Sequence, residues 1–146
     1  MTDEDFMRIA IEESKKGDWP YGAVVVKNGQ IFAQAHNTTT RDKDPSAHAE
    51  VNAIRAAMQA IPEHSLEGYT LYTSSESCPM CASTEIWANV SRVVFGASIK
   101  QLMAAGQLQI NIPAANVNKE GFVHYELVGG VLADEALKVV IESSPS

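Results

Sequence analysis

Two short stretches dominate this sequence: His48-Ala49-Glu50, and Cys78-Pro79-Met80-Cys81, which begins 30 residues after the histidine. One imidazole and two thiolates are ligands that a borderline-soft divalent ion such as zinc prefers. A catalytic zinc site commonly has three protein ligands and leaves the fourth position to water. The sequence therefore predicts a zinc site on His48, Cys78 and Cys81, and a fold that brings the two stretches together.

The C-x-x-C stretch fits the start of a helix. Two sulfurs at this spacing converge when the second lies in the first turn, and Pro79 suits the first helical position because its missing N–H costs no hydrogen bond there. A helix N-terminus also favours negative charge, which helps to keep both sulfurs as thiolates. A redox pair or part of a structural zinc site would fit C-x-x-C alone, but a structural site needs a fourth protein ligand, and H-x-E at this distance argues against both.

Glu50 is positioned as a proton shuttle. Residues two apart on a regular helix point to roughly opposite sides, so His48 and Glu50 can reach one water only at a helix start. Asp44-Pro45-Ser46 predicts such a start, with an N-cap candidate and a proline that discourages helix upstream. A carboxylate beside a metal-bound water accepts its proton and passes it to the leaving group, which is the chemistry of hydrolysis.

Length and composition predict one soluble globular domain over residues 1–146. Hydrophobic residues make up 45% and charged residues 20% of the chain, both ordinary values. The acidic start of the chain is unlike a secretory signal, and no apolar run approaches the length of a membrane span, so we expect a cytoplasmic protein without membrane contact. The net charge of −7, with no basic cluster beyond Lys15-Lys16, weighs against a nucleic-acid partner.

Periodicity and turn residues predict alternating helices and strands. Strands are expected over 23–26, 31–35, 69–73, 92–95 and 123–128, and helices over 2–16, 48–61, 79–89 and 133–140. Asn28-Gly29 predicts a two-residue hairpin. A strand, a helix and a strand in that order imply parallel pairing through a crossover. Residues 101–119 show no sustained period and are expected to be mostly loop, with a helical turn near Leu102. The sum is an α/β fold with three α/β/α layers.

The two stretches also carry a resemblance. H-x-E followed by P-C-x-x-C is the signature of zinc-dependent nucleobase deaminases, and His48-Ala49-Glu50 with Glu76-Ser77-Cys78-Pro79-Met80-Cys81 resembles the cytidine deaminase superfamily. Ser77 departs from the signature, which has proline before the first cysteine. We expect a changed turn and little loss of chemistry, because the ligands remain. The resemblance spans roughly residues 20–136 and implies a homodimer and a five-stranded mixed sheet with both metal-site helices at one edge.

The resemblance further implies contacts with the substrate. Asn37 would by position be an ordinary loop residue, but related deaminases place an asparagine after the second strand, where its amide reads the polar edge of the base. The backbone N–H of Ala49 is placed to hold a ring carbonyl or nitrogen. Trp87 alone would be a core residue, but guanine deaminases stack the purine on a tryptophan at this offset. Structural roles are expected for Tyr21 and Glu85. His36, His64 and His124 could in principle be metal ligands, but each is more simply explained as a surface or strand residue.

Two resemblances compete for the substrate. Residues 37–50 and 86–88 are similar to guanine and related free-base deaminases, whereas residues 130–136 are similar to the tail of tRNA adenosine deaminases. The acidic balance favours the first, although the C-terminal Ser143-Ser144-Pro145-Ser146 lacks the aromatic lid segment of guanine deaminases. We therefore expect zinc-dependent hydrolytic deamination of a small free heterocycle, with guanine to xanthine favoured. Cytosine, an aminotriazine and tRNA adenosine are the alternative substrates.

Overall fold

Five strands form one mixed sheet in the order β2-β1-β3-β4-β5. The computed structural model describes residues 1–143, so the expectation about the tail falls mostly on residues 144–146, outside the described part. The inner strand β1 (Gly22–Lys27) pairs antiparallel with β2 (Gln30–His36) and with β3 (Thr70–Ser75). β3 pairs in parallel with β4 (Arg92–Ala97), and β4 with β5 (Glu126–Val128). The expected five-stranded mixed sheet is confirmed.

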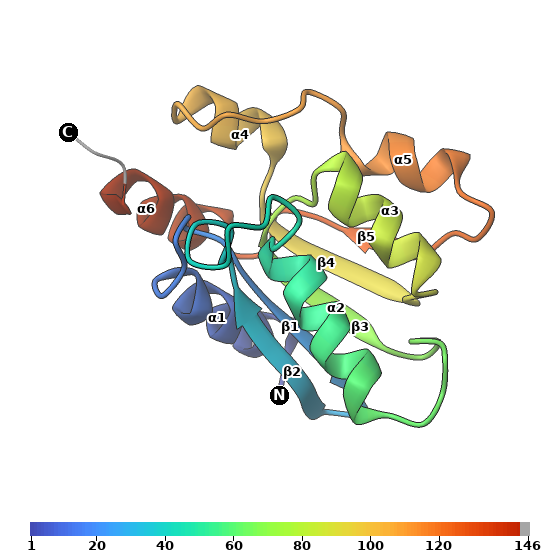
Figure 1. Cartoon of the computed structure of the whole chain (residues 1–146). Helices are drawn as coiled ribbons and strands as arrows, with labels where there is room; N and C mark the ends of the chain where they lie inside the picture. The colour runs from blue at the N-terminus through green and yellow to red at the C-terminus, as the bar shows by residue number, and fades with distance from the viewer. Residues whose placement is uncertain (144–146) are drawn as a thin grey trace.

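Helices cover both faces of this sheet, as Figure 1 shows. On one face, α1 (Asp3–Ser14), α4 (Ile99–Ala104) and α6 (Ala133–Ser143) enclose an apolar cluster with the inward side chains of the sheet. On the other face lie α2 (Ala49–Ala60) and α3 (Pro79–Trp87), with α5 (Ala114–Glu120) packed against α3. The three-layer α/β/α prediction is therefore confirmed.

The sequence of β1 explains its place inside the sheet. Alternate side chains point to opposite faces of a strand, and here Ala23 and Val25 join the cluster under α2 while Val24 and Val26 join the cluster under α1. A continuous apolar run suits a strand that is covered on both sides. β1 turns into β2 through Asn28 and Gly29, whose φ values of 50° and 76° match the hairpin turn that the Asn-Gly pair predicts.

Two regions of the chain differ from the prediction. The region expected to be mostly loop contains the helices α4 and α5, which no hydrophobic period announces because most of their residues are exposed. The last strand is confined to Glu126–Val128, so only part of the alternating run 123–128 pairs with β4. Both differences concern elements at the periphery, and the central sheet is as expected.

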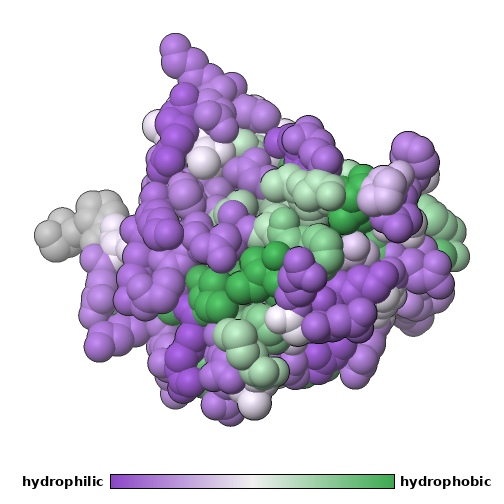
Figure 2. Space-filling model, turned by 90° about the horizontal axis from the view of Figure 1, so that it is seen from below, coloured by the Kyte–Doolittle hydropathy of each residue, from purple (hydrophilic) through white to green (hydrophobic). Residues whose placement is uncertain are grey.

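The surface is mostly polar. In the view from below in Figure 2, hydrophilic side chains surround a smaller area of apolar ones near the middle of the visible face. Within residues 1–143, no helix is both long enough and apolar enough to cross a bilayer.

Strand pairing gathers the functional segments at one edge of the sheet. Gly22, at the start of β1, pairs with His36, at the end of β2. At the same edge Ser75, the last residue of β3, pairs with Ala97 at the end of β4. The chain leaves β3 there toward α3 and leaves β2 toward α2. The segments around residues 21, 37 and 76–78 therefore meet above this edge.

Candidate metal centre and substrate pocket

The three expected ligands meet at the N-terminal ends of α2 and α3. His48 is the N-cap residue of α2, Cys78 is the N-cap residue of α3, and Cys81 lies in the first turn of α3. The Nδ1 atom of His48 lies 3.7 Å from Sγ of Cys78 and 3.5 Å from Sγ of Cys81, and the three donor atoms lie within 4.8 Å of one another. This separation and donor set suit one zinc ion with an open fourth position.

The start of α2 differs in detail from the prediction. Asp44, the expected N-cap candidate, instead accepts hydrogen bonds at Oδ1 from the backbone N–H and the hydroxyl of Ser46, which makes a turn before the helix. His48 takes the N-cap position with an extended backbone (φ −71°, ψ 158°) and makes no capping hydrogen bond with its side chain. Its ring is therefore free to face the two sulfurs.

The charges of the cluster are strongly perturbed. A hydrogen bond with Cys81, together with His48, lowers the pKa of Cys78 to about 4, so that this sulfur is a thiolate at neutral pH. The same hydrogen bond and the burial of Cys81 raise the pKa of the second thiol. Because metal binding requires thiolates, we expect zinc to displace the proton that Cys81 keeps in the metal-free protein.

Glu50 lies beside the ligands in the first turn of α2. Its side chain is 6% exposed, and burial raises the pKa of Glu50 to about 7, with a further contribution from the Cys78 thiolate. Together with His48, Cys78 and Tyr21 it lines a small cavity of about 40 Å³, enough for about one water molecule. A carboxyl group with a pKa near neutrality can both accept and donate a proton.

A larger pocket of about 430 Å³ opens next to the metal ligands. Asn37 borders it and is only 3% exposed. Its Oδ1 accepts hydrogen bonds from the backbone N–H of Thr39 at 3.1 Å and from the Thr39 hydroxyl at 2.9 Å. Because backbone N–H is a fixed donor, this pairing also fixes the amide orientation. The Nδ2 group of Asn37 is thereby left as a hydrogen-bond donor for a bound molecule.

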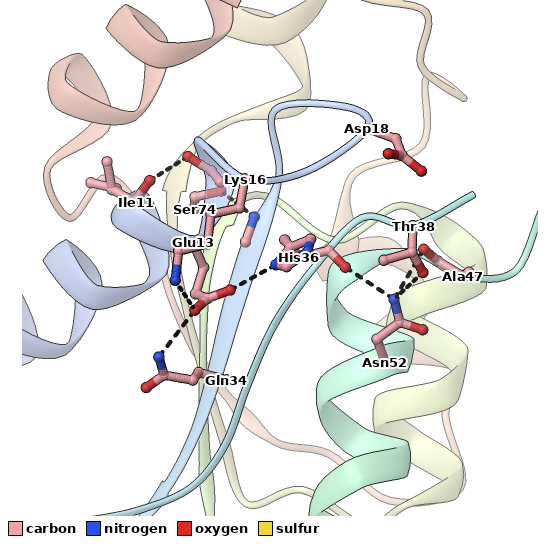
Figure 3. Close-up of polar contacts among 12 residues, drawn as sticks. Ile11, Glu13, Lys16, Asp18, Gln34, His36, Thr38, Ala47, Asn52 and Ser74 are labelled. Atoms are coloured by element: carbon pink, nitrogen blue, oxygen red, sulfur yellow. Dashed lines mark hydrogen bonds and ion pairs between the residues drawn. The ribbon is translucent and has the colours of Figure 1, made fainter. Parts of the chain in front are cut away.

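A polar network holds the loop that carries Asn37 (Figure 3). The Asn52 amide of α2 donates hydrogen bonds to the carbonyl oxygens of His36 and Ala47 and to the hydroxyl of Thr38, and so joins both ends of the loop. The ring of His36 in turn lies 2.8 Å from the buried carboxylate of Glu13 on α1. His36 is the last residue of β2, as expected of a strand residue, and its ring contacts Glu13.

Sequence reasoning missed the opposite wall of the pocket. Trp19, Gln107 and Gln109 line it, and the Tyr21 hydroxyl donates to Gln107 Oε1 at 2.7 Å and accepts from Gln109 Nε2 at 3.2 Å. Tyr21 was expected to be structural, but it borders both the pocket and the small cavity beside Glu50. No local pattern marks Gln107 or Gln109, because they are joined to Tyr21 across more than 80 residues of sequence.

Trp87 lies outside this pocket. It is the last residue of α3, about 13 Å along the helix axis from Cys78, because each residue adds about 1.5 Å. Its side chain is 77% exposed and contacts Phe122, with the ring centres 4.9 Å apart. The expectation that this ring belongs to the core is therefore wrong. Trp87 does not border the pocket beside the metal ligands, and its stacking on a purine stays a prediction.

Ala49 occupies the expected place. It is the first residue of α2, directly between His48 and Glu50, and its side chain is fully buried. The first N–H groups of a helix have no acceptor within that helix, so this N–H is available for a ligand. Within residues 1–143, no histidine other than His48 joins the metal-ligand cluster.

Comparisons with known proteins agree with this geometry. Residues 1–97 match the family described as the cytidine and deoxycytidylate deaminase zinc-binding region. A tRNA-specific adenosine deaminase of Bacillus subtilis (strain 168) is 42% identical over 138 residues, covering 91% of this chain and 83% of the relative. A guanine deaminase of the same organism is 39% identical over 111 residues, covering 73% and 71%.

The solved structures show the same likeness. An X-ray structure of guanine deaminase from Bacillus subtilis matches with a TM-score of 0.71 and 34% identity, over 88% of this chain and 86% of the other. Relatives named for guanine and for tRNA are thus both similar to this chain. The acidic net charge alone therefore does not exclude a nucleic-acid partner.

Proposed function

Because the chain belongs to the zinc-binding cytidine and deoxycytidylate deaminase family, we propose that it hydrolytically removes an amino group from a free nucleobase and releases ammonia. Guanine is the first candidate, and cytosine and aminotriazines follow. The guanine deaminase relatives support this order. The metal centre and the pocket beside it supply the physical reasons for proposing deamination of a free base.

The composition of the pocket carries the proposal. Uncharged side chains make up its wall apart from the metal ligands His48 and Cys78: Trp19, Tyr21, Asn37, Thr39, Gln107, Leu108, Gln109 and Ile110. No lysine or arginine is among these lining residues, and Arg41 nearby is bound to the carboxylate of Asp18. A phosphate backbone is normally held by such cations, whereas a neutral base needs only apolar contacts and a few amide groups.

Each polar group of the site has a role in the proposed reaction. A zinc ion on His48, Cys78 and Cys81 would supply a water molecule of lowered pKa. Glu50 accepts a proton from this water as its oxygen attacks the amino-bearing carbon, and delivers it to the adjacent ring nitrogen. Glu50 then carries the second proton of the water to the amino group, the C–N bond breaks, and ammonia leaves. The Asn37 amide and the Ala49 N–H hold acceptors on the base.

A tRNA adenosine deaminase is the second candidate. The observation that favours it is the 42% identity to the tRNA-specific enzyme over 91% of this chain. An RNA substrate would require phosphate contacts outside the pocket. Its affinity would then fall steeply with salt, because each neutralised phosphate releases a counterion.

The decisive experiment measures ammonia release from zinc-loaded protein with free bases, aminotriazines, nucleosides and a tRNA. We expect turnover of a free base, guanine first. We also expect Glu50→Ala to keep its zinc and to lose activity by about 100-fold to 10,000-fold, because it removes the proton carrier. Glu63→Ala, at an exposed position, is the matched control and should be unchanged.

Three results would contradict the proposal in different ways. Activity on tRNA with none on free bases would establish the second candidate. Turnover of cytosine or an aminotriazine without guanine would refute only the order of substrates. A metal-replete Glu50→Ala protein with nearly full activity would remove Glu50 from the mechanism.

We also propose that the chain forms a homodimer. Trp87 and Phe122 are 77% and 65% exposed and border a second groove of about 640 Å³ with Ile112. Exposed apolar patches of this kind often mark protein contacts. Light scattering on the purified protein tests this proposal, and a monomeric mass would refute it.

A further inference from the structure

A buried hydrogen bond joins the residue before the first metal-site cysteine to the body of α3. The Ser77 hydroxyl donates to Glu85 Oε2 at 2.6 Å, and the two side chains belong to residues that are 1% and 0% exposed. Ser77 lies on the short segment between β3 and α3, next to Cys78, whereas Glu85 lies in the second turn of α3, one turn after Cys81. The bond therefore braces both sides of the turn that presents the sulfurs.

Glu85 is an unexpected residue at this position. Its buried neighbours in the sequence of α3, Ala82 and Ile86, are apolar, and glutamate is rarely fully buried without partners. One carboxyl oxygen, Oε1, has no hydrogen-bond partner in the described structure, and the same holds for the Tyr125 hydroxyl. Burying such a group is unfavourable unless its hydrogen bonds compensate. The carboxyl has a hydrogen bond from Ser77 and also interacts with Tyr125. Only the Ser77 bond connects it to the turn that carries the sulfur ligands.

Position 77 is where the sequence departs from the deaminase signature. A proline there would fix its own φ and restrict the residue before it to an extended conformation, which stiffens the approach to the first cysteine. Serine has neither property. Within residues 1–143 the Ser77 N–H forms no hydrogen bond, so a proline at this position would forfeit none.

We propose that the Ser77–Glu85 hydrogen bond replaces this proline, and that Glu85 is a positioning residue for the zinc site. By holding Ser77 against α3, Glu85 keeps the Cys78 sulfur near Cys81 and His48 before metal binds. Such preorganisation strengthens metal binding, as other outer partners of metal ligands do. The proposal concerns the metal site alone and is independent of which substrate the enzyme uses.

Zinc affinity, measured by competition with a chromogenic chelator, tests the proposal. We expect Glu85→Met to weaken zinc binding by about 10-fold to 100-fold, the usual effect of losing an outer residue that orients a metal ligand. The absorption spectrum of the cobalt-substituted protein should change in parallel, because it reports the geometry of the sulfur ligands. The thermal midpoint of the metal-free variant should be equal or higher, since methionine suits a buried site.

Recovery of zinc affinity by a second substitution would distinguish a positioning role of Glu85 from a packing role. The double variant Ser77→Pro/Glu85→Met should recover zinc affinity to within about threefold of the original, because proline again stiffens the turn. Glu85→Gln keeps an acceptor for Ser77 and should also stay within about threefold. Ser83→Ala is the matched control. It removes the hydroxyl that donates to the Pro79 carbonyl in the same helix, and it should leave zinc affinity unchanged.

Two outcomes would overturn the proposal. Unchanged zinc affinity in Glu85→Met would show that the bond does not position the ligands. Weakened affinity that Ser77→Pro does not restore, together with a lower melting point of the metal-free protein, would assign Glu85 to packing only. If Glu85→Met does not fold, Ser77→Ala breaks the same bond from the other side and is judged by the same criteria.

Discussion

At the scale of single residues, we propose that Asn37 selects which edge of a substrate fits the pocket. Its Oδ1 is occupied by Thr39, so only the donor Nδ2 is left for a substrate. A substrate must therefore offer an acceptor at this point, such as a ring nitrogen or a carbonyl oxygen. A buried site built around one hydrogen bond discriminates strongly, because a wrong group leaves a buried polar atom unpaired.

Asn37→Asp tests this reading. The carboxylate replaces the donor by an acceptor and adds a charge, so we expect kcat/KM for the best substrate to fall by at least about 100-fold, while zinc content stays the same. Thr39→Val is the matched control. It removes only the hydroxyl contact to Asn37 and keeps the backbone N–H, and should cost less than about 10-fold. Equal effects of the two variants would argue against a substrate contact through Nδ2.

At the scale of elements, one carboxylate organises two helices. Glu76, 8% exposed and directly after β3, accepts hydrogen bonds of 2.8 Å from the backbone N–H of Ile99 at Oε1 and of Ala114 at Oε2. These are the first residues of α4 and α5. The segment between the two helices carries Gln107 and Gln109. Glu76 thus anchors both ends of the pocket wall.

Glu76→Gln should loosen this wall. The amide offers one acceptor oxygen in place of two and turns a donor toward one helix N–H, so we expect a loss of about 2 kcal/mol in the free energy of unfolding and a higher KM. Ser98→Ala is the control, because it removes the cap of α4 alone. We expect it to cost about 1 kcal/mol without changing KM. Urea unfolding and steady-state kinetics measure both, and a variant as stable as the original would contradict the anchoring role.

Features that depend on local sequence patterns could be predicted, whereas features that depend on contacts between distant residues could not. The Asn28-Gly29 hairpin, the start of α3 at Pro79 and the metal ligands follow from local patterns, and all three are confirmed. α5 was missed because its first N–H is held by Glu76, 38 residues earlier in the chain. Trp87 is exposed and not part of the core, which could not be predicted because motif spacing does not show where the far end of a helix points.

At the scale of the whole molecule, an ion pair ties the start of α1 to the sheet. Arg92, the first residue of β4, donates hydrogen bonds to both carboxylate oxygens of Asp3 at 2.9 and 2.7 Å, and the Tyr72 hydroxyl donates to the same group at 2.6 Å. The Arg92 hydrogen bonds lower the pKa of Asp3 to about 2 from its ordinary value of 3.8. These contacts join elements 69 and 89 residues apart in the sequence.

This pair makes stability depend on pH in acid. Because the folded-state pKa of Asp3 is depressed, its contribution is fully present above pH 4 and is lost as the pH falls from about 4 to about 2. The Asp3 side chain is 37% exposed, so solvent screening limits the contribution to about 1 kcal/mol. Asp3→Asn should therefore destabilise the protein by about that amount at pH 7 and by almost nothing at pH 2.

Denaturant unfolding between pH 2 and 7 measures this difference. Glu4→Gln, an exposed carboxyl in the same first turn of α1, is the matched control for the charge at the helix N-terminus. We expect it to change stability by only a few tenths of a kcal/mol. A difference between Asp3→Asn and the original protein that does not shrink in acid would refute the assignment.

The hairpin between β1 and β2 lies at the end of the sheet remote from the chemistry. Gln30 lies six positions before His36 along the extended strand β2, a span of about 20 Å. Asn28, Gly29 and Gln30 are exposed, and a Cβ atom added at Gly29 would contact nothing within 4 Å. A dye or a tether attached to Gln30 would therefore leave the pocket accessible, which offers a way to fix the molecule on a sensor surface with its substrate entrance facing the solution.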